Sequence, residues 1–416
     1  MILIGPFRQL LTMDHLPEKG AIQDAELEIM SNSGICMQDG KIIEIADFSV
    51  LMDKWANQSE VIYLEDDYIA LPGYIDCHTH IAFAGDRAQD FAMRNAGSTY
   101  LEIAEAGGGI WSTVKHTRAC TATELRDLTV QRAHVLMKQG ITTIEVKSGY
   151  GLSINEELKT LRSIKEAKKI SKVDLISTCL AAHMKPKDFE GTAEAYLQEM
   201  ANELFPILVQ EDLTSRVDAF IEQSAFTAEQ ARPYLKQAKQ LGFDITIHAD
   251  QFSTSGSALA VELQAVSADH LEASTDMEIK QLANSEVVAV ALPAASLGLG
   301  CAFTPARELL DAGACLAIAT DWNPGSAPMG SLIASASILA THQKLSNAEL
   351  FSAITNRAAK ALKLADRGIL KPGLLADFIL YKTSNYQNIT YLQGSLQPEQ
   401  VWKNGQCIYS QKNINS

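Results

Sequence analysis

Positive charge is scarce in this chain, which has 35 Lys and Arg residues against 50 Asp and Glu and a net charge of −15. This excess of acid repels nucleic acids and anionic membranes, so we expect neither as a main partner. The chain also lacks an unbroken apolar segment that could span a bilayer, because its longest charge-free run, residues 287–306, contains Pro293 and two glycines. An anionic small substrate is not excluded, since one arginine can override the global field locally.

Patterns typical of disulfide pairing and of a secretory signal are also scarce, so we expect neither. The seven cysteines are an odd number, lie scattered and form no CxxC motif, which is typical of reduced thiols. The first eight residues lack the basic-then-apolar order of a secretory signal. Glycines 107–109 lack the lysine of a phosphate-binding P-loop, so we interpret them as a flexible loop that could serve as a lid. We therefore expect a cytoplasmic protein.

The chain does contain a long alternation of strand-like and helix-like segments. The strand-like segments cover residues 68–75, 141–146, 173–180, 217–221, 243–248, 265–268, 287–292 and 315–320. Amphipathic segments separate most of them, and Gly140, Gly242 and Gly313 suit helix C-caps just before the next strand. Alternating strands and helices indicate a parallel sheet, and eight such strands predict an α/β fold of the (β/α)8 TIM-barrel type over residues 67–365.

The two ends of the chain resemble short β-strands instead. Asp39-Gly40 and Asn404-Gly405 each lie between two strand-like segments, and such dipeptides favour two-residue hairpin turns with positive φ. Short strands at both ends are poor candidates for two separate domains. We therefore expect residues 1–66 and 366–416 to pair into one small β-sandwich domain, with the barrel inserted between them.

Polar residues follow the predicted barrel strands, at the end where the active site of such a barrel lies. Five of the nine histidines occupy these positions, namely His78, His80, His183, His248 and His270. In an extended chain alternate side chains point the same way, so His78 and His80 can bind one metal ion. We predict one zinc or iron ion per chain, held by His78, His80, His248 and Asp321. The alternatives are a solvated histidine at position 248 and a helix N-cap at position 321.

A bound metal ion lowers the pKa of a coordinated water towards ~7 and so provides a nucleophile near neutral pH. Asp321, close to both the metal and the water, could take the proton. His270 has no metal in this hypothesis and could orient the nucleophile or pass a proton to a leaving nitrogen. The alternative for His270 is a structural histidine that bridges two strands.

Residues 71–80, which end in His-Thr-His, resemble the metal motif of the amidohydrolase superfamily, in which the fifth strand also supplies a histidine ligand. Further motifs lie in the loops: Phe83-Ala-Gly-Asp-Arg87, Phe91-Ala-Met-Arg94, Ala106-Gly-Gly-Gly-Ile110, Val146-Lys-Ser-Gly-Tyr-Gly-Leu152, His248-Ala-Asp-Gln251, Ser267-Ala-Asp-His-Leu-Glu272 and Thr320-Asp-Trp-Asn-Pro-Gly-Ser326. Together they resemble the imidazolonepropionase family. The resemblance implies hydrolysis of the ring amide C–N bond of 4-imidazolone-5-propanoate, a small anionic cyclic amide, to N-formimidoyl-L-glutamate in histidine degradation. It also implies one zinc or iron ion and a homodimer.

Substrate contacts are implied by the same resemblance, motif by motif. These residues are Arg87, Tyr150, His183, Asn323, Gly325 and Ser326. The rigid guanidinium fork of Arg87 suits the propionate of the substrate, and Tyr100 and Tyr150 can add hydroxyl donors. Neutral His183 could hydrogen-bond the ring carbonyl or a ring nitrogen.

Gln251 departs from the family pattern, because some members have a glutamate there as a candidate base. We assign Gln251 to the catalytic and substrate-binding set as a hydrogen-bonding group, which leaves Asp321 or His270 as the proton acceptor. Lys147 follows the second strand, whereas two-metal amidohydrolases carry a carboxylated lysine on the fourth, which here ends in Glu222. We therefore favour one metal and expect Lys147 to form a salt bridge with Glu145 or Asp76.

Two other functions remain open. Another mononuclear amidohydrolase, such as a nucleobase-type deaminase, would share the metal ligands, but a neutral base needs no cation like Arg87. A non-catalytic barrel scaffold would be expected to lose metal ligands, and metal content would separate it from an enzyme.

Overall fold

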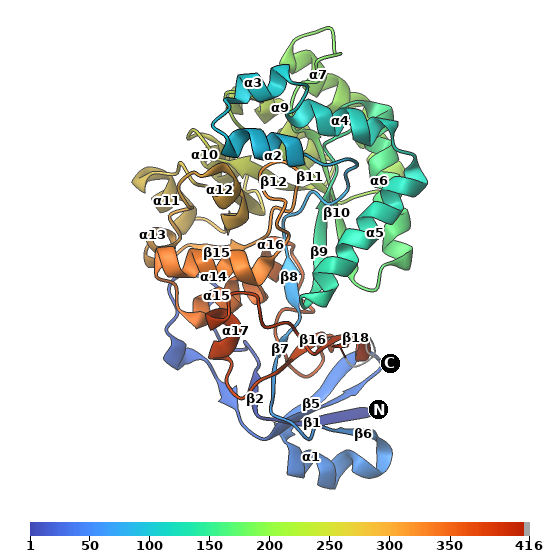
Figure 1. Cartoon of the computed structure of the whole chain (residues 1–416), viewed down its shortest axis with the longest axis vertical. Helices are drawn as coiled ribbons and strands as arrows, with labels where there is room; N and C mark the ends of the chain where they lie inside the picture. Colours follow the sequence, from blue (N-terminus) through green and yellow to red (C-terminus); the bar gives the residue numbers. More distant parts are fainter. Residues whose placement is uncertain (412–416) are drawn as a thin grey trace.

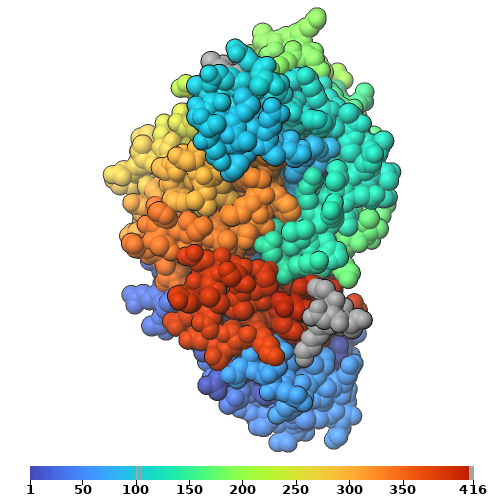
Figure 2. All heavy atoms as spheres, viewed as in Figure 1, coloured from blue at the N-terminus to red at the C-terminus, as the bar shows by residue number. Residues whose placement is uncertain are grey.

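A computed structural model of the chain describes residues 1–411, except for the side chains of residues 100, 101 and 104. Figure 1 shows a barrel with its surrounding helices stacked on a smaller β domain that holds both ends of the chain. In the space-filling view of Figure 2 the red C-terminal segment lies between the barrel and the blue N-terminal segment. The two ends of the sequence therefore meet on one side of the barrel, as predicted.

Eight parallel strands form the barrel, and neighbours in sequence are neighbours in the sheet. They are β8 (Tyr74–Asp76), β9 (Ile141–Lys147), β10 (Asp174–Ala182), β11 (Arg216–Phe220), β12 (Asp244–Ala249), β13 (Ser267–His270), β14 (Val288–Ala291) and β15 (Cys315–Ile318). The first and last strands meet just beyond their ends, where the N–H of Asp321 donates to the carbonyl of His78 and the N–H of His80 donates to that of Trp322, both at 3.0 Å. The predicted (β/α)8 barrel is confirmed.

Helices connect these strands on the outside. They are α2 (Ala88–Asn95), α3 (Tyr100–Glu105), α4 (Ile110–Ala119), α5 (Ala122–Lys138), α6 (Ile154–Ile170), α7 (Ala193–Glu199), the π-helix η3 (Met200–Leu204), α8 (Phe205–Gln210), α9 (Ala228–Gln240), α10 (Gly256–Glu262), α11 (Asp276–Ala283), α12 (Pro293–Leu299), α13 (Ala306–Asp311), α14 (Leu332–Gln343), α15 (Asn347–Ala353) and α16 (Asn356–Ala361). Helix α5 begins with a capping box made by Thr121 and Glu124. Gly140, Gly242 and Gly313 have positive φ angles and follow α5, α9 and α13, which confirms the predicted caps. None of the helices in the described part of the chain is long and apolar enough to cross a membrane.

Two sheets form the small domain. One has the order β5-β4-β1-β6 and the other β18-β17-β16-β7-β2-β3. Their elements, with the short helices that join them, are β1 (Ile2–Phe7), β2 (Gln9–Leu11), η1 (Asp24–Glu26), β3 (Ile29–Met30), β4 (Ser33–Gln38), β5 (Lys41–Asp47), α1 (Phe48–Trp55), η2 (Ala56–Gln58), β6 (Glu60–Tyr63), β7 (Tyr68–Pro72), β16 (Phe378–Lys382), α17 (Gln387–Tyr391), β17 (Gln400–Lys403) and β18 (Gln406–Ser410). Buried residues from both sheets, such as Ile4, Ile35, Tyr68 and Phe378, share one apolar core.

The two predicted hairpins are present in this domain. Asp39 and Gly40 join β4 to β5, and Asn404 and Gly405 join β17 to β18, in both cases with positive φ at both turn positions. A turn with two positive φ angles matches the twist of antiparallel strands, which is why such dipeptides mark hairpins.

The single strand expected at residues 68–75 is two strands, and this part of the prediction is wrong. Strand β7 pairs with β2 and β16 in the small domain, whereas β8 pairs with β9 in the barrel. Gly73 separates them, and a side chain at that position would overlap the side chain of Thr142. An apolar run without alternation cannot reveal such a break. The domain boundaries at residues 66 and 366 stay a prediction.

Candidate active site

Three histidines and one aspartate converge at the carboxyl ends of the barrel strands. His78 and His80 follow β8, His248 lies on β12, and Asp321 follows β15. The Nε2 atom of His80 lies 3.3 Å from Nε2 of His78 and 3.2 Å from Nε2 of His248. Oδ1 of Asp321 lies 3.5 Å from Nε2 of His78 and 3.3 Å from Nε2 of His80. All four side chains are buried.

This geometry fits a single metal ion. In a tetrahedron with metal–ligand bonds of about 2.0–2.1 Å, the ligand atoms lie about 3.3–3.4 Å apart, which matches the four distances. Burial lowers the pKa of His80 well below its usual value and that of His248 to about 3, so both rings are neutral. With the protons on Nδ1, both rings aim an Nε2 lone pair at the same point, which is the arrangement that a metal ion between them requires. The four predicted ligands therefore form a coherent donor set, and the three histidines meet the spacing of a metal site.

Two carboxylates inside the barrel orient two of these imidazoles. Asp269 Oδ2 lies 2.6 Å from Nδ1 of His78, and Asp218 Oδ2 lies 3.0 Å from Nδ1 of His248. A carboxylate at Nδ1 favours the proton on that nitrogen and leaves Nε2 free to bind a metal. The sequence prediction assigned no role to Asp218 or Asp269. An acidic residue within the apolar strand at residues 217–221 was the signal that could have found Asp218.

Lys147 lies beneath these carboxylates. Its Nζ atom is 2.7 Å from Oε1 of Glu145 and 2.8 Å from Oδ2 of Asp218. The predicted salt bridge to Glu145 is confirmed. Asp76, the alternative partner, instead accepts hydrogen bonds from the backbone N–H and hydroxyl of Thr320 at 3.0 and 2.6 Å.

A cavity of about 480 Å³ opens above the three histidines and Asp321. The predicted site residues that line it are His80, Arg87, Tyr150, His183, His248, Gln251, His270, Asp321, Asn323, Gly325 and Ser326. His78 lies deeper, and the side chain of Tyr100 lies outside the described residues. The cavity also contains Arg94, Phe220 and Phe252, which the prediction did not select. The fold thus brings the predicted residues whose side chains are described to one place.

Arg87 is held in place at the cavity wall. Its Nε atom donates to Oδ2 of Asp90 at 2.7 Å, and the same oxygen accepts the backbone N–H of Gly109 at 2.8 Å. One carboxylate thus connects the arginine to the glycine loop at residues 107–109. A Cβ at position 325 would overlap Nη1 of Arg87, so a larger residue there would displace the guanidinium. The lid role of the glycine loop stays a prediction.

His183 is fixed by its other ring nitrogen. Nδ1 lies 2.9 Å from the carbonyl oxygen of Gly149, so it donates there and leaves Nε2 with a lone pair. Burial lowers the pKa of His183, which keeps the ring neutral. Its centroid lies 5.5 Å from that of Tyr150 and 5.6 Å from that of His80. A flat ring bound above the histidine cluster would meet this group.

The loop after β15 is organised by Asn323. Its Nδ2 donates to Oδ2 of Asp321 at 2.9 Å, while its Oδ1 accepts the backbone N–H groups of Gly325 and Ser326, both at 2.8 Å. Asn323 therefore orients the carboxylate of Asp321 and shapes the loop.

His270 and Gln251 also line the cavity. The ring of His270 is 5.4 Å from that of His248, and its Nδ1 is 3.4 Å from Oε1 of Glu272, so its Nε2 is the nitrogen left for the cavity. Glu222 accepts the backbone N–H groups of Phe252 and Ser253 at 2.8 and 2.9 Å. Glu222, the role of which the sequence left open, therefore fixes the loop that begins at Gln251.

Comparisons with known proteins agree with this geometry. The pattern of the amidohydrolase family matches residues 87–409. A protein of Bdellovibrio bacteriovorus named imidazolonepropionase is 38% identical over 98% of this chain and 96% of its own, and one of Idiomarina loihiensis with the same name is 42% identical over 80% and 82%. This chain belongs to the amidohydrolase family, in its imidazolonepropionase branch.

Solved structures of more distant proteins share the fold. Atrazine chlorohydrolase of Arthrobacter aurescens, complexed with zinc, aligns with a TM-score of 0.72 at 18% identity over 99% of this chain and 95% of its own. An adenosine deaminase of Xanthomonas campestris with bound zinc aligns with a TM-score of 0.70 at 18% identity over 99% and 93%. These likenesses support the barrel architecture of the family member described here.

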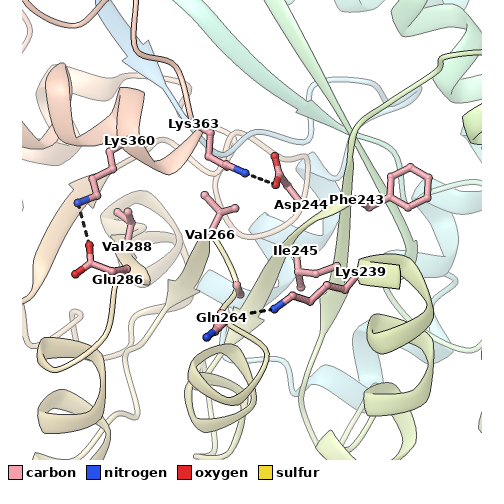
Figure 3. Close-up of a pocket in the computed structure, with 11 residues that line it drawn as sticks. Lys239, Phe243, Asp244, Ile245, Gln264, Val266, Glu286, Val288, Lys360 and Lys363 are labelled. Atoms are coloured by element: carbon pink, nitrogen blue, oxygen red, sulfur yellow. Dashed lines mark hydrogen bonds and ion pairs between the residues drawn. The ribbon is translucent and has the colours of Figure 1, made fainter. Parts of the chain in front are cut away.

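A second pocket of about 360 Å³ lies at the amino ends of the barrel strands, and Figure 3 shows its lysines turned toward acidic or amide side chains. Lys363 pairs with Asp244 at 2.8 Å, and Lys360 pairs with Glu18 at 2.7 Å and with Glu286 at 3.4 Å. Because these charges already have partners, this pocket is a poorer candidate than the cavity above the histidines.

Proposed function

We propose that this site hydrolyses the ring amide C–N bond of 4-imidazolone-5-propanoate to N-formimidoyl-L-glutamate, with one zinc or iron ion per chain. One observation supports the proposal above all others. The four donor atoms of the histidines and Asp321 lie at the floor of a cavity, and Arg87 lies in the wall of the same cavity. The names of the relatives at 38–42% identity support the same reaction. A small cyclic amide with a carboxylate arm needs both features, one for the ring carbonyl and one for the anion.

A metal ion held by His78, His80, His248 and Asp321 supplies Lewis-acid activation of water and of the ring carbonyl. Arg87 binds the propionate, because its Nε is committed to Asp90 and its remaining N–H groups can form a fork with a carboxylate. His183 Nε2 and the Tyr150 hydroxyl lie where the ring would be placed. Gln251 can donate and accept hydrogen bonds to the ring but cannot take a proton.

Proton transfer falls to two residues. Asp321 is placed to accept the proton of the attacking water, because its Oδ1 lies 3.3 Å from Nε2 of His80 and 3.5 Å from Nε2 of His78 and so borders the point at which the metal would be held. His270 delivers a proton to the ring nitrogen as the C–N bond breaks, through the ring nitrogen that does not face Glu272. The products are a carboxylate at the former carbonyl carbon and a free nitrogen on the formimidoyl group.

The test is an ultraviolet assay of 4-imidazolone-5-propanoate loss by purified, metal-loaded protein. We expect turnover that a chelator abolishes and that added zinc or iron restores. Absence of turnover by protein that carries about one ion per chain would refute the assignment. Less than about 0.2 ion per chain after gentle purification would favour a barrel that has lost catalysis.

A deaminase acting on a neutral ring is the second candidate, because the same donor set would serve it. The two functions differ in their need for a cation at the cavity wall, so a neutral ring substrate turned over equally by the parent protein and by Arg87→Ala would favour the deaminase.

A further inference from the structure

Lys147 is a fully buried lysine in the interior of the barrel. It lies at the end of β9, and its Nζ atom is 2.7 Å from Glu145, 2.8 Å from Asp218 and 3.9 Å from Asp269. It takes no part in the proposed reaction. A buried ammonium group is costly unless compensating charges surround it.

The barrel explains why these groups meet. Side chains that point into a (β/α)8 barrel form layers, and each layer draws its members from alternate strands. Lys147, Asp218 and Asp269 lie on β9, β11 and β13, which are the second, fourth and sixth barrel strands. Glu145 lies two residues before Lys147, on the same face of β9. One ammonium group therefore faces three carboxylates in a layer just beneath the histidines.

The same carboxylates also face the histidines. Asp218 lies 3.0 Å from Nδ1 of His248, and Asp269 lies 2.6 Å from Nδ1 of His78. Without a cation, three buried carboxylates this close would repel one another and turn apart. That movement would take a carboxylate away from each imidazole ring.

We propose that Lys147 is a positioning residue for the metal: by holding Asp218 and Asp269 in place, it keeps Nε2 of His248 and of His78 aimed at one point. This inference rests on the metal role given to the histidines in the proposed function. It assigns the lysine no contact with the metal or with substrate, and its effect is on the affinity for the ion.

The chain offers a matched control in Lys403, a second buried lysine between two carboxylates. Its Nζ atom lies 2.6 Å from Asp377 and 2.8 Å from Asp174. Asp174 is the first residue of β10, at the far end of the barrel from the histidines. Replacing either lysine by methionine removes one buried positive charge and keeps an unbranched side chain that is one atom shorter.

The experiment measures zinc affinity by competition with a chromophoric chelator for the full-length parent, Lys147→Met and Lys403→Met. We expect a lower unfolding midpoint for both variants, but a dissociation constant for zinc raised about tenfold or more only for Lys147→Met, since loss of groups that orient ligands typically costs about 10–100-fold. The absorption bands of the cobalt-loaded protein should change only in Lys147→Met.

Equal or tighter zinc binding by Lys147→Met would overturn the inference, because the lysine would then merely fill the barrel or oppose the ion. If Lys147→Met does not fold, Asp218→Asn replaces it in the same assay, and a zinc affinity equal to the parent's would overturn the inference as well. A parent protein that binds no zinc or iron would instead refute the proposed function, so the two failures are distinguishable.

Discussion

The two ends of the barrel differ in how their charged and polar groups are partnered. At the carboxyl end, buried imidazoles face one another at 3.2–3.3 Å, and three carboxylates share the ammonium of Lys147. At the amino end, partly exposed lysines such as Lys363 and Lys360 each have carboxylate partners of their own. Paired surface charges stabilise a fold weakly, whereas buried imidazole nitrogens that converge on one point are suited to bind a cation. Function is therefore expected where the charges are not balanced locally.

The largest effect is expected when one imidazole is removed from the carboxyl end. His248→Ala should lose more metal affinity than the about 10–100-fold typical for a group that only orients a ligand, because a ligand itself is gone, and turnover should fall with it. Metal content by mass spectrometry and the ultraviolet assay measure the two effects. His342→Ala, a histidine on the outer helix α14, is the control and should keep the full metal content. Normal metal binding by His248→Ala would contradict the proposed set of metal ligands.

A second test concerns the cation that the carboxyl end offers to a substrate. Arg87→Ala should raise KM for 4-imidazolone-5-propanoate about 10–100-fold, since a hydrogen bond to a charged group contributes about 1.5–3 kcal/mol. Metal content should not change. Arg87→Lys, which keeps the charge but loses the fork, should fall between the two proteins. Steady-state kinetics measure these values, and unchanged KM values would contradict the assignment of Arg87 to the propionate.

A smaller effect is expected from the carboxylate that fixes the loop after Gln251. Glu222→Ala should lower kcat/KM about tenfold, because the loop loses the acceptor of two backbone N–H groups and its residues shift. Glu222→Gln keeps an acceptor oxygen and should restore most of the activity. Zinc affinity should stay at the parent value in both variants. Equal activity in all three proteins would mean that the loop holds its shape without Glu222.

The smallest effect belongs to the amino end. Lys363→Met breaks the pair with Asp244, in which the lysine side chain is 60% exposed, so the free energy of unfolding should change by less than about 1 kcal/mol. Zinc affinity and turnover should not change. Chemical denaturation and the ultraviolet assay test this. A clear loss of activity would show that the amino-end pocket contributes to function, contrary to the expectation that function lies at the carboxyl end.

Much of the fold was predictable because its signals are local. The helix caps at Gly140, Gly242 and Gly313 and the hairpin turns at residues 39–40 and 404–405 depend on a few neighbouring residues. The break at Gly73 was not predictable, because residues 68–75 are apolar throughout while their partners lie in two different sheets. Of the partners of Lys147, Glu145 was predicted because it lies two residues away. Asp218, which lies 71 positions along the chain, was not predicted.

The sequence by itself determined the alternation of strands and helices and the placing of histidines and Asp321 at or just after strand ends, since both are set by periodicity and order along the chain. Only the tertiary structure decided which nitrogen of each imidazole faces the common point, and which carboxylates hold it there. Those orientations depend on the closure of the barrel, which brings β9, β11 and β13 into one interior layer, and no local pattern encodes that closure.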